Sequence, residues 1–128
     1  MSTVAVSDVI DAAPALVWAL LTDVPGRGRW LSTVDSVDVV TPGVFRTGTV
    51  WRETRAMGDG GFVTEEFQVR ECEAPRRFVV SSPGSGADYR MTYTLAPVEV
   101  GRHRGGTTVT VEQEGHASGT TGRVLEMV

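Results

Sequence analysis

Hydrophobic and polar residues alternate along most of the chain, which predicts half-buried strands because successive side chains of a strand point to opposite faces. The first such segment covers residues 3–11. The later segments cover residues 34–40, 47–57, 62–73, 77–82, 89–95 and 107–114. Glycine-rich turns separate most of the later segments, and such turns join antiparallel neighbours. The pattern therefore predicts an antiparallel sheet built largely from successive hairpins.

A different spacing follows the first strand. Apolar residues recur there every three or four positions, which predicts a helix with one apolar stripe. The stripe consists of Leu16, Val17, Leu20 and Leu21. Pro14 suits the first turn, Pro25-Gly26 ends the helix, and a second short helix or turn is expected at residues 27–31. One strand, two short helices and a long run of strands indicate the α+β class.

The turn at Asp59 and Gly60 decides which side chains of the adjoining strands share a face. We expect a two-residue turn at these positions, because turn length fixes the register of a hairpin. With this register the inner face contains Val50, Arg52, Thr54 and Ala56 opposite Val69, Phe67, Glu65 and Val63. The opposite face contains Trp51 and its neighbours of the same parity.

Two charged residues are thereby predicted to be neighbours inside the sheet. Arg52 and Glu65 lie diagonally across the hairpin, with Thr54 between them. Charged groups removed from water must be paired or stay hydrated, so the interior is expected to be partly wet. A β-bulge in either strand would move both charges to the outside.

The sixth predicted strand adds phenol groups to the same interior. Tyr89, Met91, Tyr93 and Leu95 share one parity and are expected to point inward. Aromatic and apolar side chains with a few polar groups are typical of a small-molecule pocket. They are equally typical of a plain core. The pattern by itself leaves both interpretations open.

Several short motifs, in this order, resemble the START-like superfamily, which is also called the SRPBCC or polyketide cyclase/dehydrase and lipid-transport superfamily. They are Ile10-Asp11-Ala12-Ala13-Pro14, Val17-Trp18, Leu21-Thr22-Asp23, Arg29-Trp30, Gly48, Arg52-Glu53-Thr54, Pro75-Arg76-Arg77, Tyr93-Thr94-Leu95, Pro97, Gly106-Thr107 and Val109. The resemblance covers nearly the whole chain. It implies a helix-grip fold, in which a curved antiparallel sheet grips a long C-terminal helix over a hydrophobic cavity.

The end of the chain departs from this pattern. Relatives continue through several more helical turns, whereas this sequence stops at Val128, and residues 123–128 are too few to hold a helix unaided. We expect the gripped helix to be truncated or missing. The alternative is that a partner chain, such as a second copy, covers the apolar face.

Composition narrows the possible functions. A length of 128 residues favours one domain spanning residues 1–128, and a net charge of −4 argues against nucleic-acid binding. The single Cys72 excludes an internal disulfide and suits a reducing, cytoplasmic location. The start of the chain predicts neither a signal peptide nor a membrane span. His103 and His116 lie too far apart for a metal pattern, so neither a metal nor a cofactor is expected.

The leading hypothesis is that a small hydrophobic molecule, lipid-like or polyketide-like, binds on the concave face of the sheet. The expected polar contacts are Arg52, Thr54, Glu65, Tyr89 and Tyr93, and the expected apolar lining is Phe67, Val69 and Met91. One alternative is a cyclase or dehydratase in which Arg52 keeps Glu65 ionised as a base, although the pattern favours a purely structural ion pair for these two residues. A third hypothesis is an interaction module whose sheet face accepts a partner helix.

Overall fold

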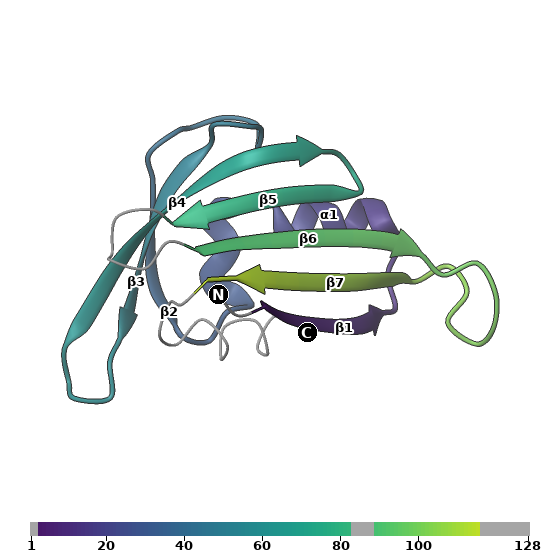
Figure 1. Cartoon of the computed structure of the whole chain (residues 1–128), viewed down its shortest axis with the longest axis horizontal. Coiled ribbons are helices and arrows are strands. Elements are labelled where there is room, and N and C mark those ends of the chain that lie inside the picture. Colours follow the sequence, from purple (N-terminus) through teal and green to yellow (C-terminus); the bar gives the residue numbers. More distant parts are fainter. Residues whose placement is uncertain (1–2, 83–88, 116–128) are drawn as a thin grey trace.

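Seven antiparallel strands form one sheet in the computed structural model, which describes residues 3–82 and 89–115 (Figure 1). The order across the sheet is β1-β7-β6-β5-β4-β3-β2. The strands are β1 (Thr3–Ile10), β2 (Val34–Val39), β3 (Val50–Ala56), β4 (Phe62–Glu73), β5 (Arg77–Ser82), β6 (Tyr89–Pro97) and β7 (Thr107–Glu114). The predicted α+β class is confirmed, with β4, β5 and β7 at the predicted positions. The expected C-terminal helical segment lies outside the described residues.

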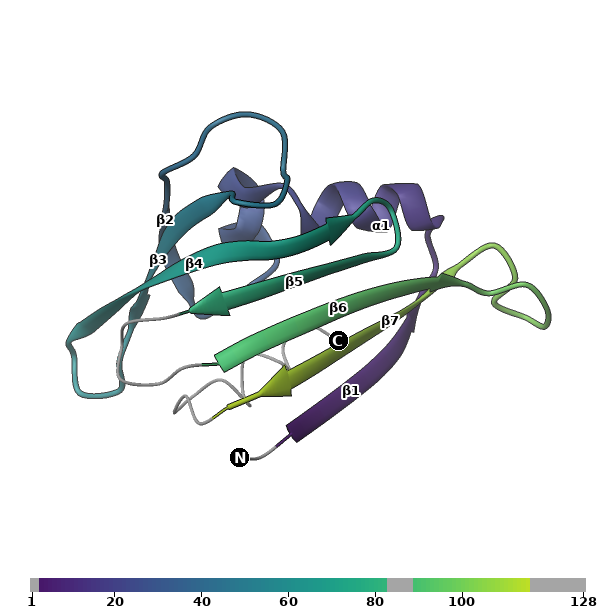
Figure 2. The ribbon, with the colours of Figure 1, turned by 45° about the horizontal axis from the view of Figure 1, so that its top comes forward.

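Two short helices follow β1, and both lie on the same side of the bent sheet (Figure 2). They are α1 (Pro14–Leu21) and the 3₁₀ helix η1 (Val24–Arg29). The second helix begins earlier than predicted because Pro25 starts it instead of ending a longer α1. Helix α1 packs against the sheet through Trp18, whose ring meets that of Phe78 edge-on at 5.4 Å.

Only half of the predicted apolar stripe of α1 faces the core. Val17 and Leu21 are buried, whereas Leu16 is 67% exposed and Leu20 is 49% exposed. Residues four apart lie on one helix face, as Val17 and Leu21 do. Leu16 and Leu20 each precede them by one residue, so they are turned by about 100° around the helix axis. The sheet therefore contacts the Val17–Leu21 edge of the helix, and the stripe prediction was wrong for the other two leucines.

The predicted register of the β3–β4 hairpin was also wrong. Trp51 pairs with Phe67, so β3 is displaced by one residue from its expected position. The cause is the turn, in which Met57 N donates to Gly61 O at 2.7 Å and Gly60 adopts a φ of 89°. This hydrogen bond encloses a three-residue loop instead of a two-residue one. The extra loop residue shifts the pairing by one residue, so the side chains of β3 exchange faces relative to those of β4.

The displaced register exchanges the inner and outer side chains of β3 and leaves those of β4 as predicted. Trp51 and Glu53 of β3 are buried, while Arg52 is exposed. On β4, Glu65 and Phe67 are buried on the inner face as expected. The core of the molecule therefore lies between the helices and a face that contains Trp51 in place of Arg52.

Candidate functional site

A charged pair lies buried where η1 meets the inner face of the sheet. The Arg27 guanidinium of η1 forms an ion pair with the Glu53 carboxylate of β3, and their side chains are only 3% and 0% exposed. Trp51 Nε1 donates a second hydrogen bond to Glu53 Oε1 at 2.9 Å. Buried charges require this degree of pairing, because an isolated carboxylate would lose its hydration without replacement.

Two tryptophan rings contact the same guanidinium. The Arg27 carbon Cζ lies 5.2 Å from the ring centroid of Trp30 and 5.0 Å from that of Trp51. Both distances permit cation–π attraction, which is strongest where water is excluded. Trp30 Nε1 is buried and has no hydrogen-bond partner among the described residues. Arg27 thus attaches η1 to the sheet both by its ion pair with Glu53 and by the contacts of its planar guanidinium with the tryptophan rings.

A second ion pair adjoins the first. Glu65 of β4 stands directly opposite Glu53 of β3, and Arg55 forms an ion pair with Glu65. Two carboxylates facing each other across a strand pair repel, so each needs its own arginine. The result is a compact group of four charges, Arg27, Glu53, Glu65 and Arg55, on the inner face. The sequence reasoning found Glu65 but assigned it the wrong arginine.

The predicted site residues fall on both faces of the sheet. Arg52 Nε donates to Glu66 Oε1 at 3.1 Å, and Thr54 and Thr64 share a hydrogen bond; all four side chains lie on the outer face. The prediction that Arg52 neighbours Glu65 in the interior was therefore wrong, because the register of β3 is displaced.

The predicted apolar lining and one of the predicted polar contacts, Tyr93, do face inward. Phe67, Val69, Met91 and Tyr93 are each 1% exposed or less. The parity predicted for these four residues is confirmed. The side chain of Tyr89 and all of His116 lie outside the described residues.

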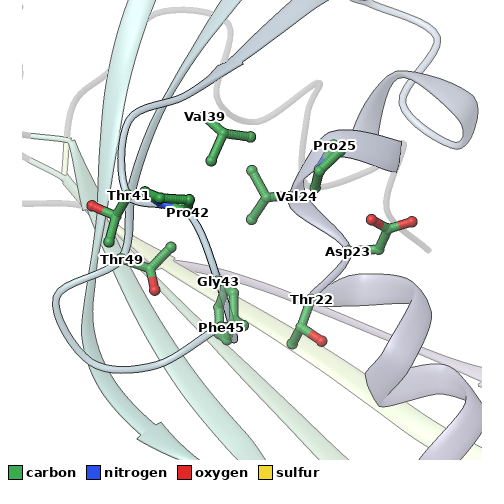
Figure 3. A pocket seen from close by; sticks show the side chains of 10 residues that line it. All are labelled: Thr22, Asp23, Val24, Pro25, Val39, Thr41, Pro42, Gly43, Phe45 and Thr49. Atoms are coloured by element: carbon green, nitrogen blue, oxygen red, sulfur yellow. The ribbon is translucent and has the colours of Figure 1, made fainter.

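An open pocket of about 390 Å³ lies between the two helices and the loop that joins β2 to β3 (Figure 3). Thr22, Asp23, Val24 and Pro25 form the helical wall, and Val39, Thr41, Pro42, Gly43, Phe45 and Thr49 form the other wall. None of the sequence-predicted site residues is among these ten. The lining comes from residues 22–25 and 39–49, which meet only in the folded chain, and no periodicity marks the pocket in the sequence.

Hydrogen bonds within the loop hold the second wall in shape. Arg46 donates from Nη1 to the carbonyl oxygen of Val44 at 2.8 Å, and its backbone N–H donates to Thr49 Oγ1 at 3.0 Å. Thr41 Oγ1 accepts from the backbone N–H of Val50 at 3.2 Å. Gly43 adopts a φ of 100°, a conformation that residues other than glycine rarely adopt. Hydrogen bonds thus constrain the loop near both of its ends.

Phe45 connects the pocket to the core. Its ring lies 5.0 Å from that of Phe78, 6.3 Å from that of Trp18 and 6.4 Å from that of Trp51. Phe78 in turn stacks on Tyr93 at 4.4 Å. Phe45 is therefore the side chain that separates the open pocket from the aromatic interior, and sequence reasoning missed it.

Comparison with known proteins identifies the family. A family model described as "Polyketide cyclase / dehydrase and lipid transport" matches residues 1–127. The chain belongs to this family. The curated protein sequences compared with it include no match. The resemblance noted in the sequence is thereby confirmed along nearly its whole length.

Solved structures of other proteins show the same fold as this member of the polyketide cyclase/dehydrase and lipid transport family. TTHA0849 from Thermus thermophilus is 23% identical with a TM-score of 0.73, covering 98% of this chain and 84% of that one. Ginseng major latex-like protein 151 from Panax ginseng is 8% identical with a TM-score of 0.71, covering 90% and 78%. The di-domain ARO/CYC protein BexL is 22% identical with a TM-score of 0.69, covering 97% and 40%. At these identities the likeness concerns the fold alone.

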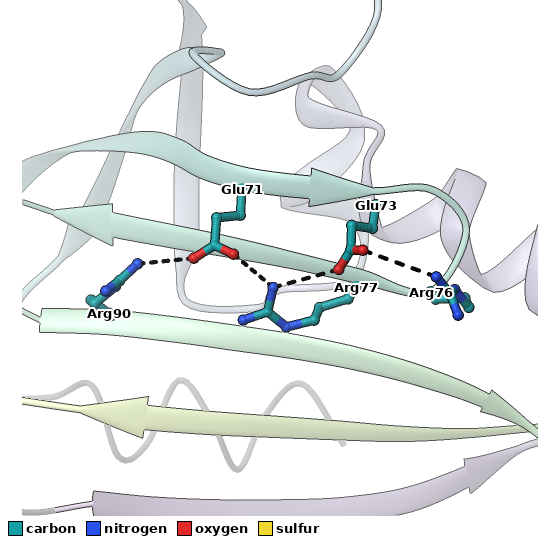
Figure 4. A network of polar contacts seen from close by, with 5 residues as sticks. All are labelled: Glu71, Glu73, Arg76, Arg77 and Arg90. Atoms are coloured by element: carbon teal, nitrogen blue, oxygen red, sulfur yellow. Dashed lines mark hydrogen bonds and ion pairs between the residues drawn. The ribbon is translucent and has the colours of Figure 1, made fainter.

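The outer face of this family member carries a network of exposed charges (Figure 4). Glu71 accepts from Arg77 at 2.9 Å and lies 3.4 Å from Arg90, while Glu73 lies 3.7 Å from Arg77. The hydrogen bond from Arg77, and then its charge, hold the pKa of Glu71 below its ordinary value. The same bond raises the pKa of Arg77. These groups stand in water on the solvated side of the sheet and are separate from the pocket.

Within residues 3–82 and 89–115, no group of three or more His, Cys, Asp and Glu side chains is arranged to hold a metal ion. In that part of the chain no helix is both long and apolar enough to cross a bilayer. Burial raises the pKa of the Cys72 thiol, which disfavours the reactive thiolate.

Proposed function

We propose that this member of the polyketide cyclase/dehydrase and lipid transport family binds a small hydrophobic molecule in the pocket between its helices and the β2–β3 loop. The observation that carries the proposal is the pocket itself, whose volume of about 390 Å³ lies within the range of small-molecule sites. Such sites combine apolar walls with a few polar groups that orient the ligand.

The lining of the pocket supports this class of ligand. Val24, Pro25, Val39 and Phe45 supply apolar surface, and three threonines supply hydroxyl groups. Asp23 is the one charged lining residue, and its carboxylate already forms an ion pair with Arg29 at 3.1 Å. A neutral, mainly apolar molecule therefore matches the walls better than an ion does.

The inward residues predicted from the sequence form the second part of the proposed site. Phe67, Val69, Met91 and Tyr93 lie on the inner face, beyond the ring of Phe45. Rotation of Phe45 away from Trp51 and Phe78 would join the open pocket to this face. The ligand then enters beside the β2–β3 loop and contacts the inward residues deeper in the molecule.

The experiment is titration of the purified protein with 2-methylnaphthalene, followed by tryptophan fluorescence. Saturable binding at one site is expected. Val39→Trp places a large ring in the pocket wall and should weaken binding at least tenfold. Val44→Trp is the matched control, since Val44 belongs to the same loop, is 81% exposed and does not line the pocket. Absence of saturable binding, or equal loss in both variants, would contradict the proposal.

A second candidate function is a cyclase or dehydratase reaction in the same interior. The observation that favours it is the pair of buried carboxylates, Glu53 and Glu65, on the inner face. A carboxylate placed beside a bound carbonyl compound can act as a general base. Turnover of a poly-β-ketone that disappears in Glu65→Gln, with binding retained, would support this reaction. Unchanged turnover in that variant would remove Glu65 from it.

A further inference from the structure

Gln113 of β7 has a buried acceptor atom that nothing in the described fold satisfies. The residue is 4% exposed, and its Oε1 has no hydrogen-bond partner among the described residues. Its cross-strand neighbours are Met91 of β6 and Val4 of β1, which offer no side-chain donor. An acceptor left unpaired in such surroundings loses its hydration without compensation, so native structures keep few of them.

The inner face links Gln113 to the pocket. The backbone N–H of Val69 donates to the carbonyl of Thr49 at 2.9 Å, and Thr49 lines the pocket. Successive cross-strand pairs then continue the row from Val69 through Val80 and Met91 to Gln113. The three intervening side chains are apolar and buried. A polar group thus stands at each end of an apolar row.

This placement distinguishes Gln113 from the other buried polar groups of the inner face. Glu53 and Glu65 each have an arginine partner. The Gln113 amide carries no charge, and none of the described residues donates a hydrogen bond to its Oε1. A leucine at this position would fill similar volume at no polar cost, so the amide is better suited to a group that arrives from outside the fold.

We propose that Gln113 Oε1 accepts a hydrogen bond from the ligand, and that the ligand is therefore an apolar molecule carrying a hydroxyl or N–H donor at its inner end. The inference rests on the proposed binding function and adds the chemical class of the ligand. The donor end lies against β7, and the apolar remainder lies along Met91, Val80 and Val69 toward the pocket.

Three probes of nearly equal shape test the donor requirement. 2-Naphthol can donate a hydrogen bond, 2-methoxynaphthalene can only accept one, and 2-methylnaphthalene can do neither. The wild-type protein should bind 2-naphthol about tenfold more tightly than the other two, the difference expected when one buried acceptor gains a donor. Equal affinity for all three probes would overturn the inference and leave the proposed function intact. No saturable binding of any probe would overturn both.

Variants assign the preference to Gln113. Gln113→Leu should bind the three probes with similar affinity while retaining 2-methylnaphthalene. Gln68→Leu is the matched control, because Gln68 lies on the outer face opposite Val50 and should keep the full preference for 2-naphthol. Gln113→Met provides a second apolar variant, with an unbranched side chain like that of glutamine, if the leucine variant does not fold. A preference for 2-naphthol that survives both Gln113 variants would refute the assignment.

Discussion

The buried Arg27–Glu53 pair permits a quantitative prediction about stability. Arg27→Met keeps a long apolar side chain between Trp30 and Trp51 but removes the charge that neutralises Glu53. Because the two side chains are 3% and 0% exposed, water cannot replace the lost partner. Breaking a buried pair in this way costs about 3–5 kcal/mol of unfolding free energy. That is a large share of the ~5–15 kcal/mol typical of a folded domain.

The sheet offers a matched control on its other face. Arg52 pairs with Glu66 at 3.1 Å, but these side chains are 53% and 46% exposed. Arg52→Met should therefore cost about 1 kcal/mol or less, since an exposed pair is screened and remains hydrated when broken. Because both variants replace the arginine of an Arg–Glu pair with methionine, the comparison separates the effect of burial from that of charge.

The assay is urea denaturation at pH 7, followed by the fluorescence of the tryptophans. Arg27→Met should lower the transition midpoint far more than Arg52→Met does. The double variant Arg27→Met/Glu53→Leu should recover much of the unfolding free energy lost in Arg27→Met, because it also removes the buried carboxylate that has lost its partner. If Arg27→Met costs no more than Arg52→Met, or if the double variant is less stable than Arg27→Met, the reasoning from burial is refuted.

Two further predictions concern the outer charges and a turn. The pKa of Glu71 is lowered in the folded protein, so its contribution to stability is present above its ordinary value of 4.5 and is lost as the pH falls through the lower folded value. Glu71→Gln should therefore reduce the loss of urea resistance between neutral and acid pH, and an unchanged pH dependence would contradict this. Gly106→Ala should cost on the order of 2 kcal/mol, because a Cβ there would lie 2.7 Å from the backbone oxygen of Ile10. Gly58→Ala has open space around it and should cost far less. Thermal unfolding of both variants measures the difference, and equal losses would refute the steric argument.

The order and type of the elements follow from local patterns in the chain. A period of two is a local property of the backbone, so the alternation in β4, β5 and β7 placed those strands correctly. The same period identified Phe67, Met91 and Tyr93 as inward side chains. Each of these predictions needs only the neighbouring residues of one strand.

The faces of β3, the buried ion pair and the pocket depend on contacts between distant parts of the chain. One extra loop residue at the tip of the β3–β4 hairpin reversed β3 and exchanged Arg52 for Trp51 and Glu53 on the inner face. The partner of Glu53 is Arg27, 26 residues away, and no local pattern connects the two. The pocket likewise needs the helices and the β2–β3 loop to meet in space. Contacts between distant segments depend on register and on the path of the loops, and periodicity within one strand carries no information about either.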